Sequence, residues 1–165
     1  MVKMVLVAFL FAASTFAQSS NSACGPENVH FDIRLDNSHS SLPKAEPQKA
    51  LVFFIQDLDA PKLGLGMHLN GRVGIDGSWT GALKDNSYFS VFLDPGEHHI
   101  CVNTDSKIFG HSAEFAHLTA EAGKVYYFRS RYLADTTVFF LAPTDSDEAK
   151  YLIANFPLRH RVTIN

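Results

Sequence analysis

Histidine is the residue type in this chain that most readily suggests chemistry. The chain has eight histidines among 165 residues, and the densest group comprises His98, His99, His111 and His117, with Glu114 in the same stretch. Zinc needs three or four nitrogen, oxygen or sulfur ligands that converge at about 2.0–2.3 Å. The spacing is not that of the helical H-E-x-x-H motif, and on a strand Glu114 faces away from His111 and His117. A metal site built from His98, His111 and His117 is therefore the alternative. The main interpretation places the histidines on sheet edges and turns.

Other catalytic patterns are incomplete. Ser78 lies one position too early for the G-x-S-x-G nucleophile elbow, and the Asp-Gly pair before it predicts a hairpin turn. Gly64-Leu65-Gly66 lacks the third glycine of a dinucleotide site. Asp145 and Asp147 fit the start of a helix, where acidic side chains are favourable. We therefore expect no catalytic residue and no cofactor. A periplasmic metal-dependent or hydrolytic enzyme that uses the histidine cluster is the alternative.

A binding surface is the more plausible functional feature. On the strand expected over residues 124–133, Tyr126, Phe128 and Tyr132 alternate with the residues of the opposite face. If the first set faces the core, the second set faces outward, and Trp79 could extend it. Aromatic residues and arginine are enriched at protein interfaces. The candidate binding surface consists of Trp79, Tyr127, Arg129 and Arg131. The alternative is a solvated sheet face with ordinary cross-strand packing.

The elements that must position these residues are short strands joined by turns. Apolar runs alternate with glycine turns between residues 72 and 132, which predicts an antiparallel β-sandwich built from hairpins. The continuous apolar run 49–56 predicts a central strand covered on both faces, and residues 136–141 are expected to form the last strand. Asp76-Gly77 is the strongest hairpin signal. Asn70-Gly71 competes with it, so the register over residues 67–83 stays open.

The two ends of the chain differ from this pattern. Ala149, Leu152, Ile153 and Phe156 recur at helical spacing, which predicts one short helix over about residues 145–155. Residues 1–17 have a positive start, an apolar run and a small-residue ending, the layout of a secretory signal peptide. The expected organisation is a signal peptide over 1–17, an arm over 18–28 and a single sandwich domain over 29–160.

Cysteine content and charge limit the compartment and the partners. An exported chain with two cysteines, Cys24 and Cys101, predicts a disulfide, and a lipid anchor on Cys24 or two free thiols are the alternatives. Such a bridge would contribute roughly 4–5 kcal/mol through loop entropy. If Ile100 and Val102 face inward, Cys101 faces outward, and the bridge straps the arm over the outer face of its sheet. The formal net charge of −3 with mixed signs offers no basic face for nucleic acid, and no segment after the leader is apolar enough to span a membrane.

Three phrases carry a resemblance to a known family. They are VGIDGSWTGAL (73–83), NSYFSVFLDPGEHH (86–99) and LTAEAGKVYYFR (118–129), and their order resembles the bacterial domain-of-unknown-function family 2846 over roughly residues 50–133. The resemblance implies an exported or lipid-anchored envelope protein with a small β-sandwich of transthyretin-like or immunoglobulin-like general shape. It implies no established activity and no catalytic residues. The chain departs from the lipid-anchored members because Asn21 lies three positions before Cys24, where an aliphatic residue is expected.

Together these observations predict an exported bacterial envelope protein, periplasmic or secreted. They favour a non-catalytic binding or structural module with a short C-terminal helix, whose partner is an envelope component. Self-assembly through the 138–140 segment is a further alternative.

Overall fold

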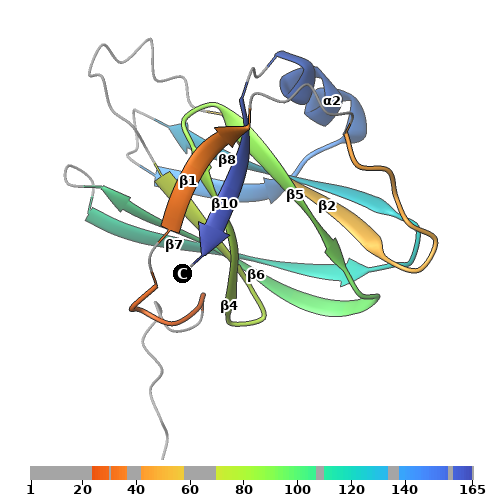
Figure 1. Ribbon diagram of the computed structural model, residues 1–165, viewed down its shortest axis with the longest axis horizontal. Coiled ribbons are helices and arrows are strands. Elements are labelled where there is room, and N and C mark those ends of the chain that lie inside the picture. The colour runs from red at the N-terminus through yellow and green to blue at the C-terminus, as the bar shows by residue number, and fades with distance from the viewer. Residues whose placement is uncertain are drawn as a thin grey trace, which may run out of the picture.

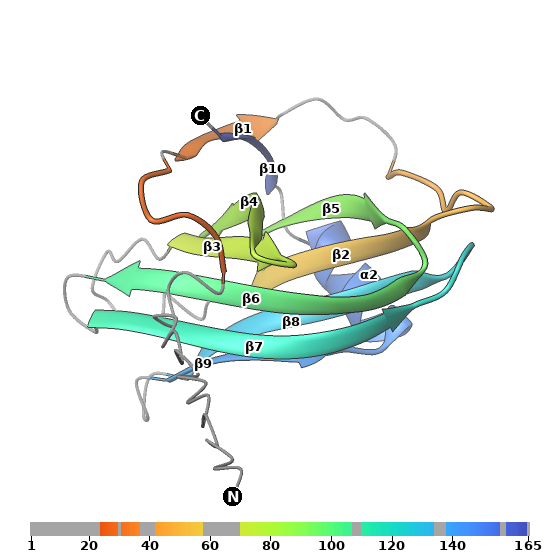
Figure 2. The same cartoon turned by 90° about the horizontal axis from the view of Figure 1, so that it is seen from below.

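In the part of the chain that the structure describes, two β-sheets stack on each other and one helix lies on the outside (Figure 1, Figure 2). The computed structural model describes residues 24–29, 31–36, 42–57, 70–106, 110–133, 138–155 and 158–164. The predicted signal peptide therefore lies outside the described residues. Within the described part of the chain, no helix is long and apolar enough to cross a membrane. The predicted fold class, a mainly antiparallel sandwich with one short C-terminal helix, is confirmed.

Six strands form the larger sheet and four form the smaller one. The spatial order in the larger sheet is β1 (Phe31–Asp36), β10 (Leu158–Ile164), β5 (Ser87–Leu93), β2 (Ala50–Asp57), β8 (Val125–Leu133) and β9 (Val138–Pro143). The order in the smaller sheet is β4 (Ser78–Lys84), β3 (Asn70–Ile75), β6 (Gly96–Ser106) and β7 (Gly110–Ala120). Helix α2 covers Ser146–Asn155. All strand pairs are antiparallel except β2 with β8 and β10 with β5.

Strand β2 is the centre of the protein, as its continuous apolar run predicted. Residues 50–56 are all buried. Ala50, Val52 and Phe54 face the smaller sheet and belong to the core between the sheets. The alternate residues of β2 pack on the other side against Ala149, Leu152 and Ile153 of α2. Because both faces of β2 are covered, apolar residues are favoured at every position, and the strand does not alternate between apolar and polar residues.

The hairpin between β3 and β4 establishes the strand register from residue 70 onward, whereas residues 67–69 of the open stretch lie outside the described residues. The turn is at Asp76-Gly77, where both residues adopt positive φ angles of 52° and 74°. This is the conformation that an Asp-Gly hairpin turn requires. Asn70 and Gly71 lie within β3 instead of in a turn. The register shifts between Val73 and Gly74, which indicates a β-bulge in the hairpin.

A strand is present where one was predicted over residues 136–141, since β9 covers Val138–Pro143 and residues 136 and 137 lie outside the described residues, but the prediction that it is the last strand is wrong. Strand β10 follows the helix, pairs with all six residues of β1, and makes a short parallel contact with β5. Figure 1 shows β1 and β10 side by side, with the C-terminus next to the start of β1. The segment carries Arg159, His160 and Arg161, so its hydrophobic alternation is weak. Its strand conformation depends on the partner strand, which lies more than 120 positions earlier in the chain.

Candidate functional site

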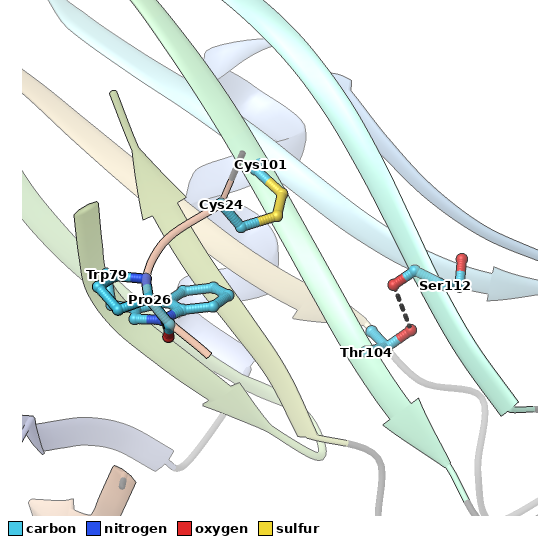
Figure 3. Close-up of a disulfide and its surroundings, with 6 residues drawn as sticks. All are labelled: Cys24, Pro26, Trp79, Cys101, Thr104 and Ser112. Atoms are coloured by element: carbon cyan, nitrogen blue, oxygen red, sulfur yellow. Dashed lines mark hydrogen bonds between the residues drawn. A yellow bond between two sulfur atoms is a disulfide. The ribbon is translucent and has the colours of Figure 1, made fainter. Parts of the chain in front are cut away.

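The predicted disulfide ties the N-terminal arm to the outer face of the four-stranded sheet. Cys24 is bonded to Cys101 of β6, and their Cα atoms are 5.2 Å apart. Ile100 and Val102, on either side of Cys101, lie in the core between the sheets. Cys101 therefore faces outward, as its position in the strand predicted, and the arm crosses the sheet there (Figure 3). Both cysteines are buried, so the bridge is shielded from solvent.

Two glycines allow the arm to lie directly on the sheet. Gly74 of β3 is the register partner of Cys101, and a Cβ atom at Gly74 would overlap the carbonyl oxygen of Cys24. A Cβ atom at Gly25 would lie 2.7 Å from the ring of Trp79. The arm and the sheet thus make backbone-level contact that a larger side chain at either position would prevent.

Trp79 holds the arm and is not a free binding residue. Its Nε1 donates a hydrogen bond of 2.7 Å to the carbonyl oxygen of Pro26, and Figure 3 shows its ring beside the arm. Phe31 packs edge-to-face on the Trp79 ring, with centroids 5.5 Å apart. The guanidinium of Arg72 lies over the ring of Phe31, 5.1 Å from the ring centroid. These contacts pack the arm and β1 onto the four-stranded sheet.

A histidine–carboxylate pair joins two turns at one end of the sandwich, and we call it the Asp76–His98 lock. His98 Nδ1 lies 2.7 Å from Asp76 Oδ2, and His98 Nε2 lies 2.8 Å from the carbonyl oxygen of Asp94. The other carboxylate oxygen of Asp76 accepts the backbone N–H of His99 at 2.8 Å. The lock thereby connects the Asp76-Gly77 turn with the turn that begins at Asp94.

The lock favours the charged form of both partners. Burial alone lowers the pKa of His98, but the hydrogen bonds to Asp94 and Asp76 and the nearby carboxylate charges outweigh burial and raise it. For Asp76, burial raises the pKa, and the hydrogen bonds from His99 and His98 with their positive charge outweigh it and lower the pKa. Both ring nitrogens of His98 are engaged, so neither is available to take a proton from a substrate. A histidine and an aspartate also form catalytic dyads, but here their hydrogen bonds join two turns of the fold.

Three exposed side chains, His99, Phe115 and His117, form what we call the β6–β7 strip. His99 lies directly opposite His117, with ring centroids 4.6 Å apart and ring planes at 78°. Phe115 is the register partner of Cys101 and lies next to His117 on the same face. Phe115 is 52% exposed. The strip lies on the outer face of the four-stranded sheet, beside the strapped arm.

The candidate surface predicted on β8 is mostly covered by α2. Tyr127 stacks on Phe53 at 5.4 Å, and burial raises the pKa of its hydroxyl. Arg129 is 8% exposed and forms ion pairs with Asp57 and with Glu148 of the helix. These residues face away from the core between the sheets, as the alternation predicted, but the strand pattern does not indicate that the helix covers them.

The remaining predicted residues lie apart from one another. Arg131 is exposed on β8, whereas Trp79 lies on the other sheet, so the four residues do not form one surface. His111 shares a face of β7 with His117 but lies six residues away, about 20 Å along a strand. His98 lies in the lock, so it does not converge with His111 and His117. No group of three or more metal-ligating side chains occurs among the described residues.

Asp145 caps α2 by accepting the backbone N–H groups of Asp147 and Glu148.

Comparison with known families adds one finding. A family model described as "Protein of unknown function (DUF2846)" matches residues 46–143, more than half of the chain. The chain belongs to this family. The DUF2846 match begins just before β2 and ends with β9, so it contains the Asp76–His98 lock and the β6–β7 strip. Cys24, α2 and β10 lie outside the DUF2846 match. Neither the curated proteins nor the solved structures gave a match.

The structure also explains the motifs on which the family resemblance rests. The Asp-Gly turn and the Pro-Gly-x-His turn of this DUF2846 domain meet through Asp76 and His98. The pairing of Asp76 with His98 is not evident from the sequence, because the two residues are 22 positions apart. The pairing of His99 with His117 is also not among the predictions. His99 and His117 each lie nine positions from residue 108, so a hairpin centred there places them opposite each other.

Proposed function

We propose that this protein is an exported, non-catalytic module of the bacterial envelope that contacts another envelope component through the outer face of its four-stranded sheet. The observation that carries the proposal is the β6–β7 strip, an exposed phenylalanine and two exposed imidazoles on a sheet that a disulfide straps from the outside. A rigid surface of this kind can bind without first being ordered, which lowers the entropic cost of association.

Two features support export. Residues 1–17 have the layout of a signal peptide, and a buried disulfide joins the arm that follows them to the domain. Disulfides persist in the periplasm and outside the cell and are rare in a reducing cytosol. Because the sulfur of Cys24 is bonded to Cys101, it is not available for attachment of a lipid, which favours a periplasmic or secreted protein over a lipid-anchored one.

Export is tested by fractionating cells that produce the untagged chain. Mass spectrometry should find the protein in the periplasm or medium, with a new N-terminus at Gln18 and both cysteines protected from alkylation before reduction. A chain that keeps Met1 and has two alkylatable thiols would refute export.

Binding is tested with a matched pair of variants. Phe115→Ser removes the exposed aromatic ring of the strip, and Tyr151→Ser removes an exposed ring from α2, where Tyr151 is 68% exposed. Quantitative capture from the native envelope should lose the same component with Phe115→Ser and retain it with Tyr151→Ser. Equal capture by both variants and the wild type would show that the strip is not the contact surface.

A further inference from the structure

The two histidines of the β6–β7 strip have the spacing of a metal chelate. His99 and His117 occupy directly paired positions of adjacent antiparallel strands, and both are exposed. Side chains at such positions have Cβ atoms about 4.5–5.5 Å apart. The ring centroids are 4.6 Å apart. Two imidazole nitrogens that bind one metal ion at about 2.0–2.1 Å lie about 3 Å from each other, so rotation of the exposed rings brings one nitrogen of each into range.

The backbone beneath the pair is held in place. The backbone N–H of His99 donates a hydrogen bond to the Asp76 carboxylate. The next residue on the same face of β6 is Cys101, which forms the disulfide. Strands β6 and β7 pair over eleven consecutive positions. The site therefore needs to order only two side chains when it binds an ion, and the strand spacing is fixed beforehand.

The neighbours of the pair do not complete a closed coordination shell. On one side of the histidine pair, Glu97 lies opposite Thr119, whose hydroxyl donates a 2.7 Å hydrogen bond to the glutamate. On the other side lies Phe115. The described residues contain no group of three or more ligating side chains. Water must then occupy the other coordination positions, which is typical of an exchangeable site and unlike the closed four-ligand sites that stabilise folds.

The geometry points to a two-histidine site for a divalent transition-metal ion, formed by His99 and His117. Imidazole nitrogen suits Cu²⁺, Ni²⁺ and Zn²⁺, and the usual affinity order places Cu²⁺ first. The sequence suggested a site formed by His98, His111 and His117. The site proposed here contains His99 in place of His98, whose ring nitrogens are both hydrogen-bonded, and it does not include His111. It requires no catalysis and is independent of whether the strip contacts an envelope component.

The test is calorimetric titration of Cu²⁺ into untagged protein with its disulfide intact. One site per chain is expected, and His99→Asn and His117→Asn should each weaken it at least tenfold. The matched control is His111→Asn, which removes an exposed histidine from the same face of β7 and should leave the affinity unchanged. Electron paramagnetic resonance should show two nitrogen ligands in the wild type and one in either weakened variant.

Three results would overturn the inference. They are wild-type affinity in either His99→Asn or His117→Asn, equal loss in His111→Asn, or a copper spectrum without two imidazole nitrogens. Thermal melting without metal checks that each variant is folded, and His99→Gln with His117→Gln provide a second pair if an asparagine variant does not fold. Envelope capture by Phe115→Ser is measured separately, so failure of the metal site and failure of the proposed function give different results.

Discussion

The Asp76–His98 lock makes the stability of the protein depend on pH in a specific direction. The raised pKa of His98 means that its contribution is fully present below about pH 6.5 and is lost as the pH rises through the higher folded value. The lowered pKa of Asp76 means that its contribution is present above about pH 3.8 and is lost as the pH falls through the lower folded value. The lock should therefore stabilise the fold most between about pH 4 and pH 6.5.

The size of the effect follows from the bonds and their exposure. A hydrogen bond to a charged group contributes about 1.5–3 kcal/mol. The side chain of His98 is 14% exposed, but that of Asp76 is 46% exposed, so solvent screens the pair and the lower end of the range applies. We expect His98→Gln to lower the free energy of unfolding by about 1.5 kcal/mol at pH 5.5. With a urea dependence of about 2 kcal/mol/M, the midpoint should fall by roughly 0.7 M.

A double-mutant cycle isolates the pair from other effects. Asp76→Asn suits the second arm because asparagine tolerates the positive φ of this position and can still accept the N–H of His99. Urea unfolding followed by circular dichroism should give a coupling energy of about 1 kcal/mol at pH 5.5 and less than about half of that at pH 8.5. Coupling that is absent at pH 5.5, or equal at the two pH values, would refute the reasoning.

Three further variants test the strap and the helix. Cys24→Ala with Cys101→Ala opens a loop of 77 residues and should lower the free energy of unfolding by about 4 kcal/mol, measured by urea unfolding; a loss below about 1 kcal/mol would contradict the strap. Gly74→Ala should push the arm off the sheet and shift the fluorescence of Trp79, the single tryptophan, to longer wavelength, whereas an unshifted spectrum would mean that the arm does not lie on Gly74. Arg129→Ala should lower the melting temperature, with a loss of about 1–2 kcal/mol, because it leaves the partly buried carboxylate of Asp57 and the exposed one of Glu148 without their cation. An unchanged melting curve would show that α2 is held by its apolar contacts alone.

Local patterns predicted most of the strands well, because strand patterns depend on residues that are close in sequence. The disulfide was predicted from the presence of two cysteines in a chain expected to be exported, although the two are 77 positions apart. The alternation around Ile100 and Val102 was enough to place Cys101 on the outer face, and the apolar run 49–56 was enough to identify a strand buried on both sides. The Asp76-Gly77 turn follows from the positive φ angles that only a few residues tolerate.

The features that sequence analysis missed all depend on which segments meet. Arg129 looks like an exposed residue on its strand and is buried only because α2 lies over it. The pairing of His99 with His117 depends on the register of β6 against β7. Strand β10 has little hydrophobic alternation of its own and is fixed by pairing with β1. Tertiary contacts of this kind cannot be read from a window of neighbouring residues.

The pairing of β1 with β10 has a consequence for the order of events during synthesis. Strand β1 has β10 as its neighbour in the sheet, and Phe31 is the register partner of Ile164. At about 5–20 residues per second, β1 must wait for roughly 7–25 seconds before its partner has been made. In the export proposed above, a chain that crosses the membrane from its N-terminus delivers Cys101 to the oxidising compartment before β10. The thiol of Cys24 can then be joined to the domain while the first strand is still unpaired. The covalent link between arm and sheet would then hold the start of the chain near its final place until the last strand closes the fold.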